Sequence, residues 1–145
     1  MHHVLYNNHI LRLAASTASA SRLLAPQGSA LKVSQVCGSK VTADVDLDQA
    51  GRVCRFGLEI RACALGQAAA ALVTVHVIGC DSAALVAARD ELADWLTARR
   101  EAEPGWPGMG VFAPARPHRA RHPSILLTFD ATIAAIADAR GVAAD

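Results

Sequence analysis

Large aromatic side chains are scarce in this sequence of 145 residues, because Phe, Tyr and Trp together make up only 4% of it. Alanine alone contributes 31 residues to a hydrophobic fraction of 52%. A core built this way must bring helices and strands close together, since small side chains cannot fill wide gaps. One domain of this length buries about 68–70% of its unfolded surface. We therefore expect a single domain over residues 1–145 that needs neither a disulfide nor a metal to fold.

Long apolar runs and an excess of charge of either sign are also absent. The nearest approach to a membrane span, residues 68–77, falls short of the roughly 18 residues required and contains His76. Fourteen basic and 13 acidic residues give a formal charge of +1, which predicts no nucleic-acid partner. The N-terminal region lacks the apolar stretch of a signal peptide. The sequence thus favours a cytoplasmic protein whose four cysteines are thiols or metal ligands.

Enzyme signatures are missing as well. Neither Ser39 nor Ser124 stands in the G-x-S-x-G context of a hydrolase nucleophile. The glycines at 105, 108 and 110 lack the preceding strand and following lysine of a phosphate-binding loop. We therefore expect a protein that acts by binding and not by catalysis.

The hydrophobic periodicity predicts an α+β fold. Apolar residues at helical spacing end before Pro26, and alternation with a period of two then marks strands over residues 31–34, 41–47 and 53–62. Short turns between these strands predict an antiparallel sheet with one solvent-exposed face. Cys54 is in phase with Phe56 and Leu58, which predicts a buried position for it. Three further helices follow: residues 64–77, a segment capped by Asp81 or Ser82, and a last helix after Pro123.

Three potential metal ligands fall at the ends of these predicted elements. Cys37 lies in the turn between the first two strands, Cys63 lies where the third strand gives way to a helix, and His122 directly precedes the last helix. A rigid scaffold can present residues at such positions together. Helical N–H groups and the neighbouring Arg61 both favour the thiolate form of Cys63, which is the form that binds metal.

The chemistry of these ligands leaves alternatives open. A site of two cysteines and one histidine suits zinc or iron, whereas carboxylate-rich sites suit magnesium or calcium. Because no C-x-x-C pair is present, the three residues could equally be unrelated, with the cysteines serving as small hydrophobic groups. Cys80 is expected about 25 Å from Cys63, at the far end of the same helix. It is therefore interpreted, like Cys54, as structural.

Four short motifs, taken together, resemble a known family. The chain contains, in order, Leu5-Tyr6-Asn7-Asn8-His9-Ile10, Cys37-Gly38-Ser39, Cys63-Ala64-Leu65-Gly66-Gln67 and Ala120-Arg121-His122-Pro123-Ser124-Ile125. This pattern is similar to that of the U-type iron–sulfur cluster assembly scaffolds, which include the N-terminal domain of the nitrogen-fixation scaffold. The resemblance extends from about residue 5 to residue 140. It implies a three-stranded antiparallel sheet with about four helices packed mainly on one face.

The resemblance also implies a function and a set of ligands. Such scaffolds accept sulfur from a cysteine desulfurase, combine it with iron as a [2Fe–2S] cluster, and pass the cluster to recipient apo-proteins. Many also bind Zn²⁺ at the same residues. The positions that match the family's ligands here are Cys37, Cys63 and His122.

This chain departs from the family pattern at two ligand positions. Pro123 stands where the family has a third cysteine, and Ser39 stands where it has an aspartate. The chaperone-binding segment Leu-Pro-Pro-Val-Lys is also missing. A [2Fe–2S] cluster takes four ligands, so a second copy of the chain, a thiol such as glutathione, or a partner protein would complete the set. The alternative hypothesis is a zinc-binding regulatory or interaction module, derived from the scaffold, that builds no cluster.

Overall fold

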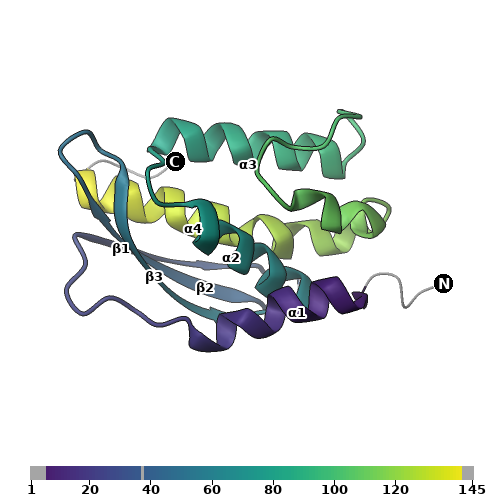
Figure 1. Ribbon diagram of the computed structural model, residues 1–145, viewed down its shortest axis with the longest axis horizontal. Helices are drawn as coiled ribbons and strands as arrows, with labels where there is room; N and C mark the ends of the chain where they lie inside the picture. The colour runs from purple at the N-terminus through teal and green to yellow at the C-terminus, as the bar shows by residue number, and fades with distance from the viewer. Residues whose placement is uncertain (1–5, 37, 142–145) are drawn as a thin grey trace.

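The computed structural model describes residues 6–36 and 38–141, so the predictions that concern Leu5 and Cys37 lie outside it. Four α-helices and three strands occur in the described residues (Figure 1). In chain order they are α1 (Asn8–Ser16), β1 (Gly28–Val33), β2 (Lys40–Leu47), β3 (Val53–Arg61), α2 (Ala64–His76), α3 (Ser82–Leu96) and α4 (His122–Arg140). Short 3-10 segments are η2 (Thr17–Ser19), η3 (Met109–Ala115) and η4 (Arg119–Arg121). The predicted α+β fold is confirmed.

The three strands form one antiparallel sheet in the order β1-β2-β3. Ala30 of β1 and Leu58 of β3 both pair with Ala43 of β2, which sets the register. Ala43 and Val45 are fully buried, and they direct one face of the sheet toward the helices. The predicted meander with one buried face is therefore confirmed, although β1 begins at Gly28 and not at residue 31.

The helices cover that buried face in two layers (Figure 1). α4 lies across β1 and β2, α2 lies beside α4 next to β3, and α1 packs on α2. α3 packs on α4 on the side away from the sheet. The layers come close because α2 buries four consecutive alanines, residues 68–71, and because β1 presents Gly28 to α4. A Cβ at Gly28 would stand 2.1 Å from the carbonyl oxygen of Ala135.

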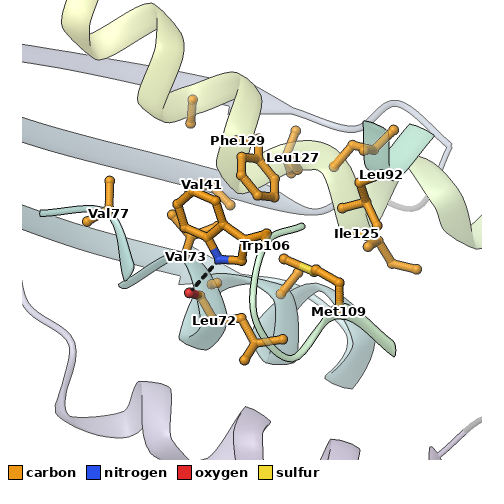
Figure 2. Packing of buried hydrophobic residues seen from close by; sticks show 14 of the residues in the cluster. Val41, Leu72, Val73, Val77, Leu92, Trp106, Met109, Ile125, Leu127 and Phe129 are labelled. Atoms are coloured by element: carbon orange, nitrogen blue, oxygen red, sulfur yellow. Dashed lines mark hydrogen bonds between the residues drawn. The ribbon is translucent and has the colours of Figure 1, made fainter. Parts of the chain in front are cut away.

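The few aromatic residues fill the space between the helices. Trp106 is 8% exposed and donates its indole N–H to the carbonyl of Leu72 at 2.9 Å, while its ring meets Phe129 edge-to-face at 5.2 Å (Figure 2). Trp95 and Phe112 are also buried. Buried large rings thus help to hold the Pro/Gly-rich segment between α3 and α4 against the helices.

Helix boundaries follow local capping chemistry. Asn7 and Asp81 accept hydrogen bonds from backbone N–H groups in the first turns of α1 and α3, as N-cap residues do. Gly141 ends α4 in the left-handed conformation, and Pro123 occupies the first turn of α4, where no N–H is needed. The structure begins α4 at His122 itself, so this residue belongs to the helix that it was predicted to precede.

The predicted burial of Cys54 is wrong, because β3 contains a bulge. Asp46 pairs with Arg55 while the next residue, Leu47, pairs with Val53, so Cys54 is the extra residue in β3. A bulge shifts the alternation of side chains by one position. Val53 is consequently buried at 1% exposure and Cys54 is exposed, with its thiol donating to the carbonyl of Asp46 at 3.3 Å.

The outer face of the sheet is not uniformly polar and wet. Asp44 points to this face but is 0% exposed, because the segment between α1 and β1 crosses over it. Its carboxylate accepts hydrogen bonds from the guanidinium of Arg22 at 2.8 and 3.0 Å, from the hydroxyl of Ser29 and from the N–H of Leu23. Gly57 permits this crossing, since a Cβ there would lie 2.6 Å from the backbone nitrogen of Leu23.

These contacts control the charge of Asp44. Burial disfavours the charged carboxylate, but the hydrogen bonds from Arg22, Ser29 and Leu23 outweigh it, so the pKa of Asp44 is lowered.

Two apolar residues of β1 are exposed to solvent. Leu31 and Val33 alternate along the strand as predicted, but their side chains remain 58% and 46% exposed. None of the helices within residues 6–36 and 38–141 is both long and apolar enough to cross a bilayer.

The buried carboxylate leads to a prediction about stability. Asp44→Ala removes the acceptor for the Leu23 N–H and the Ser29 hydroxyl, and should lower the free energy of unfolding by about 2–3 kcal/mol at neutral pH in urea titrations. Because the folded-state pKa is lowered, this contribution is complete above the ordinary carboxyl pKa and declines as the pH falls through the lowered one.

The matched control for this prediction is Asp90→Ala. The side chain of Asp90 is 63% exposed, and its one ion pair, with Arg89, spans 3.6 Å. This variant should change stability by less than about 0.5 kcal/mol. Equal losses in the two variants would contradict the role assigned to Asp44.

Candidate metal centre

Three segments that are far apart in the chain meet at one end of the sheet. Lys40, the first residue of β2, pairs with Arg61, the last residue of β3. The turn that leads into β2 and the start of α2, which follows β3, therefore lie at the same end of the strands. In Figure 1 the starts of α2 and α4 point toward this end, opposite the β2–β3 hairpin.

A buried hydrogen bond joins the turn to α4. Ser39 is 4% exposed and Ser124 is 3% exposed, and their hydroxyl oxygens lie 3.2 Å apart. The turn itself is closed by two backbone bonds, from Ser34 N–H to the carbonyl of Ser39 and from Gly38 N–H to the carbonyl of Ser34. Gly38 has a φ of 72°, a left-handed conformation that glycine adopts without strain. The start of α4 thus fixes the position of Ser39, directly before β2.

A glycine in the first turn of α2 brings that helix against α4. A Cβ at Gly66 would stand 2.8 Å from the Cβ of Ala62 and 3.2 Å from the carbonyl oxygen of Ser124. The two helix starts can therefore approach only because residue 66 has no side chain. Ser124 contacts both the turn through its hydroxyl and α2 through its backbone.

Cys63 is the N-cap residue of α2, as the sequence predicted. Its side chain is partly buried and makes no capping hydrogen bond, while its carbonyl accepts the N–H of Gln67 at 3.0 Å. The amide of Gln67 donates to the carbonyl of Ala62 at 3.1 Å, which holds the link between β3 and α2. Cys63 thus stands at a helix start, a place where the N–H groups of the first turn favour negative charge.

His122 is 6% exposed and is oriented by the segment before it. Its Nε2–H donates to the carbonyl of Ala115 at 3.0 Å. Since a carbonyl can only accept, the proton lies on Nε2 and the lone pair of the neutral ring lies on Nδ1. Metal-binding histidines commonly use one ring nitrogen for the metal and donate the other to a carbonyl in this way.

The predicted ligand set is only partly described. Cys63 and His122 lie on the two helix starts that meet at Gly66 and Ser124, whereas Cys37 lies outside the described residues. Among residues 6–36 and 38–141, no group of three or more His, Cys, Asp or Glu side chains could hold a metal ion. A site of three such ligands at this end therefore needs at least one residue from outside these ranges, and Cys37 is the one that the sequence predicts.

Comparison with known proteins identifies the family. No protein-family model matches the sequence, and no curated protein matches it either. The crystal structure of a nitrogen-fixing NifU-like protein (N-terminal) from Brucella abortus is 37% identical, with a TM-score of 0.87 over 97% of this chain and 98% of that chain. This chain belongs to the NifU-like N-terminal family.

A more distant structure shares the same fold. It is described as an iron–sulfur cluster assembly scaffold protein for the SUF system from Fervidobacterium islandicum AW-1. It has 16% sequence identity and a TM-score of 0.80 over 92% of this chain and 98% of that chain. At this identity the likeness concerns the arrangement of helices and strands.

The remaining cysteines of this NifU-like chain lie in different surroundings. Burial raises the pKa of the Cys80 thiol, and the neighbouring Asp81 adds to the effect, so this side chain stays protonated. Cys54 is exposed on the β3 bulge next to the β2–β3 hairpin, whereas Cys63 follows the opposite end of that strand. Neither residue belongs to the end of the sheet where Cys63 and His122 lie.

Sequence reasoning missed the residues that hold the site together. The sequence pattern presents both Ser39 and Ser124 as candidate nucleophiles and Ser39 also as a substituted ligand position, yet the two serines hydrogen-bond to each other. The backbone carbonyl of Ala115 orients His122, and no residue type in the sequence indicates such a backbone contact. Gly66 was the one detectable clue, since a glycine within an alanine-rich helix costs helix stability and therefore implies a close contact.

The contact at Gly66 can be tested by adding one methyl group. In an unconstrained helix Gly→Ala stabilises by about 1 kcal/mol. Here the new Cβ overlaps Ala62 and presses on Ser124, so Gly66→Ala should lower the free energy of unfolding by about 1–3 kcal/mol in urea titrations.

Gly105→Ala serves as the control, because the nearest atom to a Cβ there, a carboxylate oxygen of Glu91, lies at 3.6 Å. Its stability should stay within about 0.5 kcal/mol of wild type. A Gly66→Ala variant as stable as wild type would mean that α2 and α4 do not need this close approach.

Proposed function

We propose that this chain is an iron–sulfur cluster assembly scaffold or carrier. It binds iron or a [2Fe–2S] cluster through Cys37, Cys63 and His122 and hands it to apo-proteins. It acts by binding and transfer and catalyses no reaction of its own. The observation that carries this proposal is the meeting of the two helix starts that bear Cys63 and His122. Membership of the NifU-like family and the fold shared with the SUF-system scaffold support it.

The surroundings of Cys63 suit a metal thiolate. Its sulfur stands at the start of a helix of 13 residues, where unpaired N–H groups favour negative charge. Its side chain is only partly buried, so iron, sulfide or a partner's sulfur can reach it. Arg61, two residues earlier in β3, adds a positive charge next to this position.

The surroundings of His122 suit a neutral ligand. The bond from Nε2 to Ala115 leaves Nδ1 as the donor atom and fixes the plane of the ring. Pro123 follows directly, at the family position of a third cysteine, and cannot accept sulfur. Two thiolates and one imidazole therefore bind the cargo with one ligand fewer than the four that a [2Fe–2S] cluster takes.

A set of three protein ligands is consistent with a protein that transfers its cluster to other proteins. The fourth ligand would come from a thiol such as glutathione, from a second copy of the chain, or from the partner itself. The partners in this proposal are a cysteine desulfurase as sulfur source and apo-proteins as recipients. A fourth ligand from another molecule makes the bound cluster labile, because dissociation of that ligand leaves one iron coordination position free.

Anaerobic reconstitution with ferric iron, sulfide and glutathione tests the proposal. Wild-type protein should gain a visible chromophore together with iron and sulfide in equal amounts. Cys63→Ala should abolish both, because it removes the thiolate at the helix start. Cys54→Ala and Cys80→Ala serve as matched controls and should load as wild type does.

Two outcomes would contradict the proposal. Unchanged iron content in Cys63→Ala would exclude this residue as a ligand. Stoichiometric zinc that blocks the chromophore in wild-type protein, with no cluster formed after zinc removal, would favour the zinc-binding regulatory module instead. Circular dichroism of each variant shows whether a loss reflects unfolding.

A further inference from the structure

Four exposed cations lie on the segments that meet at the candidate metal centre. They are Lys40, Arg61, Arg119 and Arg121, which we call the basic collar. No ion pair involving any of them occurs within residues 6–36 and 38–141, whereas Arg22, Arg55, Arg89 and Arg100 all pair with carboxylates elsewhere. The overall charge of +1 therefore conceals an uneven distribution.

The fold brings the collar together from three segments. Lys40 and Arg61 stand directly opposite each other on neighbouring strands. Arg119 and Arg121 belong to η4, immediately before His122. The hydrogen bond between Ser39 and Ser124 ties these two pairs to the same end of the sheet, since Ser39 directly precedes Lys40 and Ser124 closely follows Arg121.

Acidic residues are excluded from these segments. Residues 34–40, 61–67 and 115–124 contain no Asp or Glu. The nearest carboxylate in the sequence is Glu59, which faces Thr42 across the sheet and reaches neither Lys40 nor Arg61 within ion-pair distance. Like charges directly opposite on a sheet are destabilising, so the Lys40–Arg61 pair costs stability unless an anion neutralises it.

We propose that the basic collar is a docking surface for an acidic polypeptide segment of the partner that exchanges sulfur or metal at Cys63. The acidic character of the partner rests on the charges alone, whereas its role in sulfur or metal transfer rests on the proposed function. Complementary charge speeds encounter and sets orientation more than it adds affinity. A partner attracted to the collar meets the chain beside Cys63 and not at the opposite end.

The distribution of charge favours a polypeptide over a nucleic acid. Strong binding of nucleic acid requires many phosphate contacts from a broad basic surface, and the collar has four cations on a chain of nearly balanced charge. Arg121 also lies over the ring of Tyr6, 6.0 Å from its centre, so one face of that ring is already covered.

Binding of a labelled polyglutamate peptide to the full chain tests the proposal by fluorescence anisotropy. The peptide should bind at about 0.05 M salt and be released at about 0.5 M, where the Debye length is much shorter. The double variant Arg119→Glu, Arg121→Glu should weaken binding about tenfold, because two attractive charges become repulsive. Negative charge at the start of α4 favours that helix, so the variant should fold.

The matched control is the double variant Arg52→Glu, Arg140→Glu. It makes the same change in net charge at two exposed arginines, one next to the β2–β3 hairpin and one at the end of α4, both at the other end of the sheet (Figure 1). Its affinity for polyglutamate should stay within about twofold of wild type. Equal weakening in both double variants, or no binding of polyglutamate at low salt, would overturn the proposal. Oligothymidylate that binds as tightly as polyglutamate would also overturn it, in favour of a nucleic-acid surface.

Anaerobic reconstitution separates this proposal from the proposed function. The collar variant should still load iron and sulfide, because Cys63 and His122 are unchanged. If wild-type protein forms no cluster but the polyglutamate results are as expected, the scaffold function fails and the acidic docking surface stands. If the cluster forms but the two double variants behave alike, the docking surface fails and the scaffold function stands.

Discussion

The structure at the candidate metal centre depends on one close contact, between the first turn of α2 and the start of α4. Gly66 allows the backbones to approach at Ser124, whose hydroxyl then bonds to Ser39 in the turn before β2. This one residue of α4 thereby links all three segments that carry the predicted ligands. A side chain at position 66 would separate the helix starts and, with them, Cys63 from His122.

The same constraint explains the unusual composition. Small residues are concentrated where helices meet the sheet or each other, at residues 68–71 of α2 and at Gly28 of β1. A large ring also fastens the segment between α3 and α4, because Trp106 donates its indole N–H to the carbonyl of Leu72. That segment ends at Ala115, whose carbonyl orients His122. The packing of Trp106 therefore helps to position the backbone carbonyl that orients His122.

Electrostatics divide the molecule into two regions. On the outer face of the sheet, Asp44 is buried and fully paired, and it fastens the segment that precedes β1. At the end of the sheet beside Cys63, the cations of the basic collar have no such partners among the described residues. The charge of Asp44 is paired within the fold, whereas the charges of the basic collar beside the candidate metal centre are exposed, as the proposed docking surface requires.

The sequence by itself determined the order of elements, since the change of period from helix to strand and the capping residues are local signals. It also located Cys63 at a helix start, and its pattern predicted Cys37 and His122 as companions. Tertiary structure decided what local patterns cannot encode. The bulge in β3 turned Cys54 outward, because register depends on the partner strand, and a crossing segment buried Asp44 on a face predicted to be wet. The meeting of Ser39, Gly66 and Ser124 was equally invisible, because it joins backbone atoms and hydroxyl groups separated by up to 85 positions along the chain.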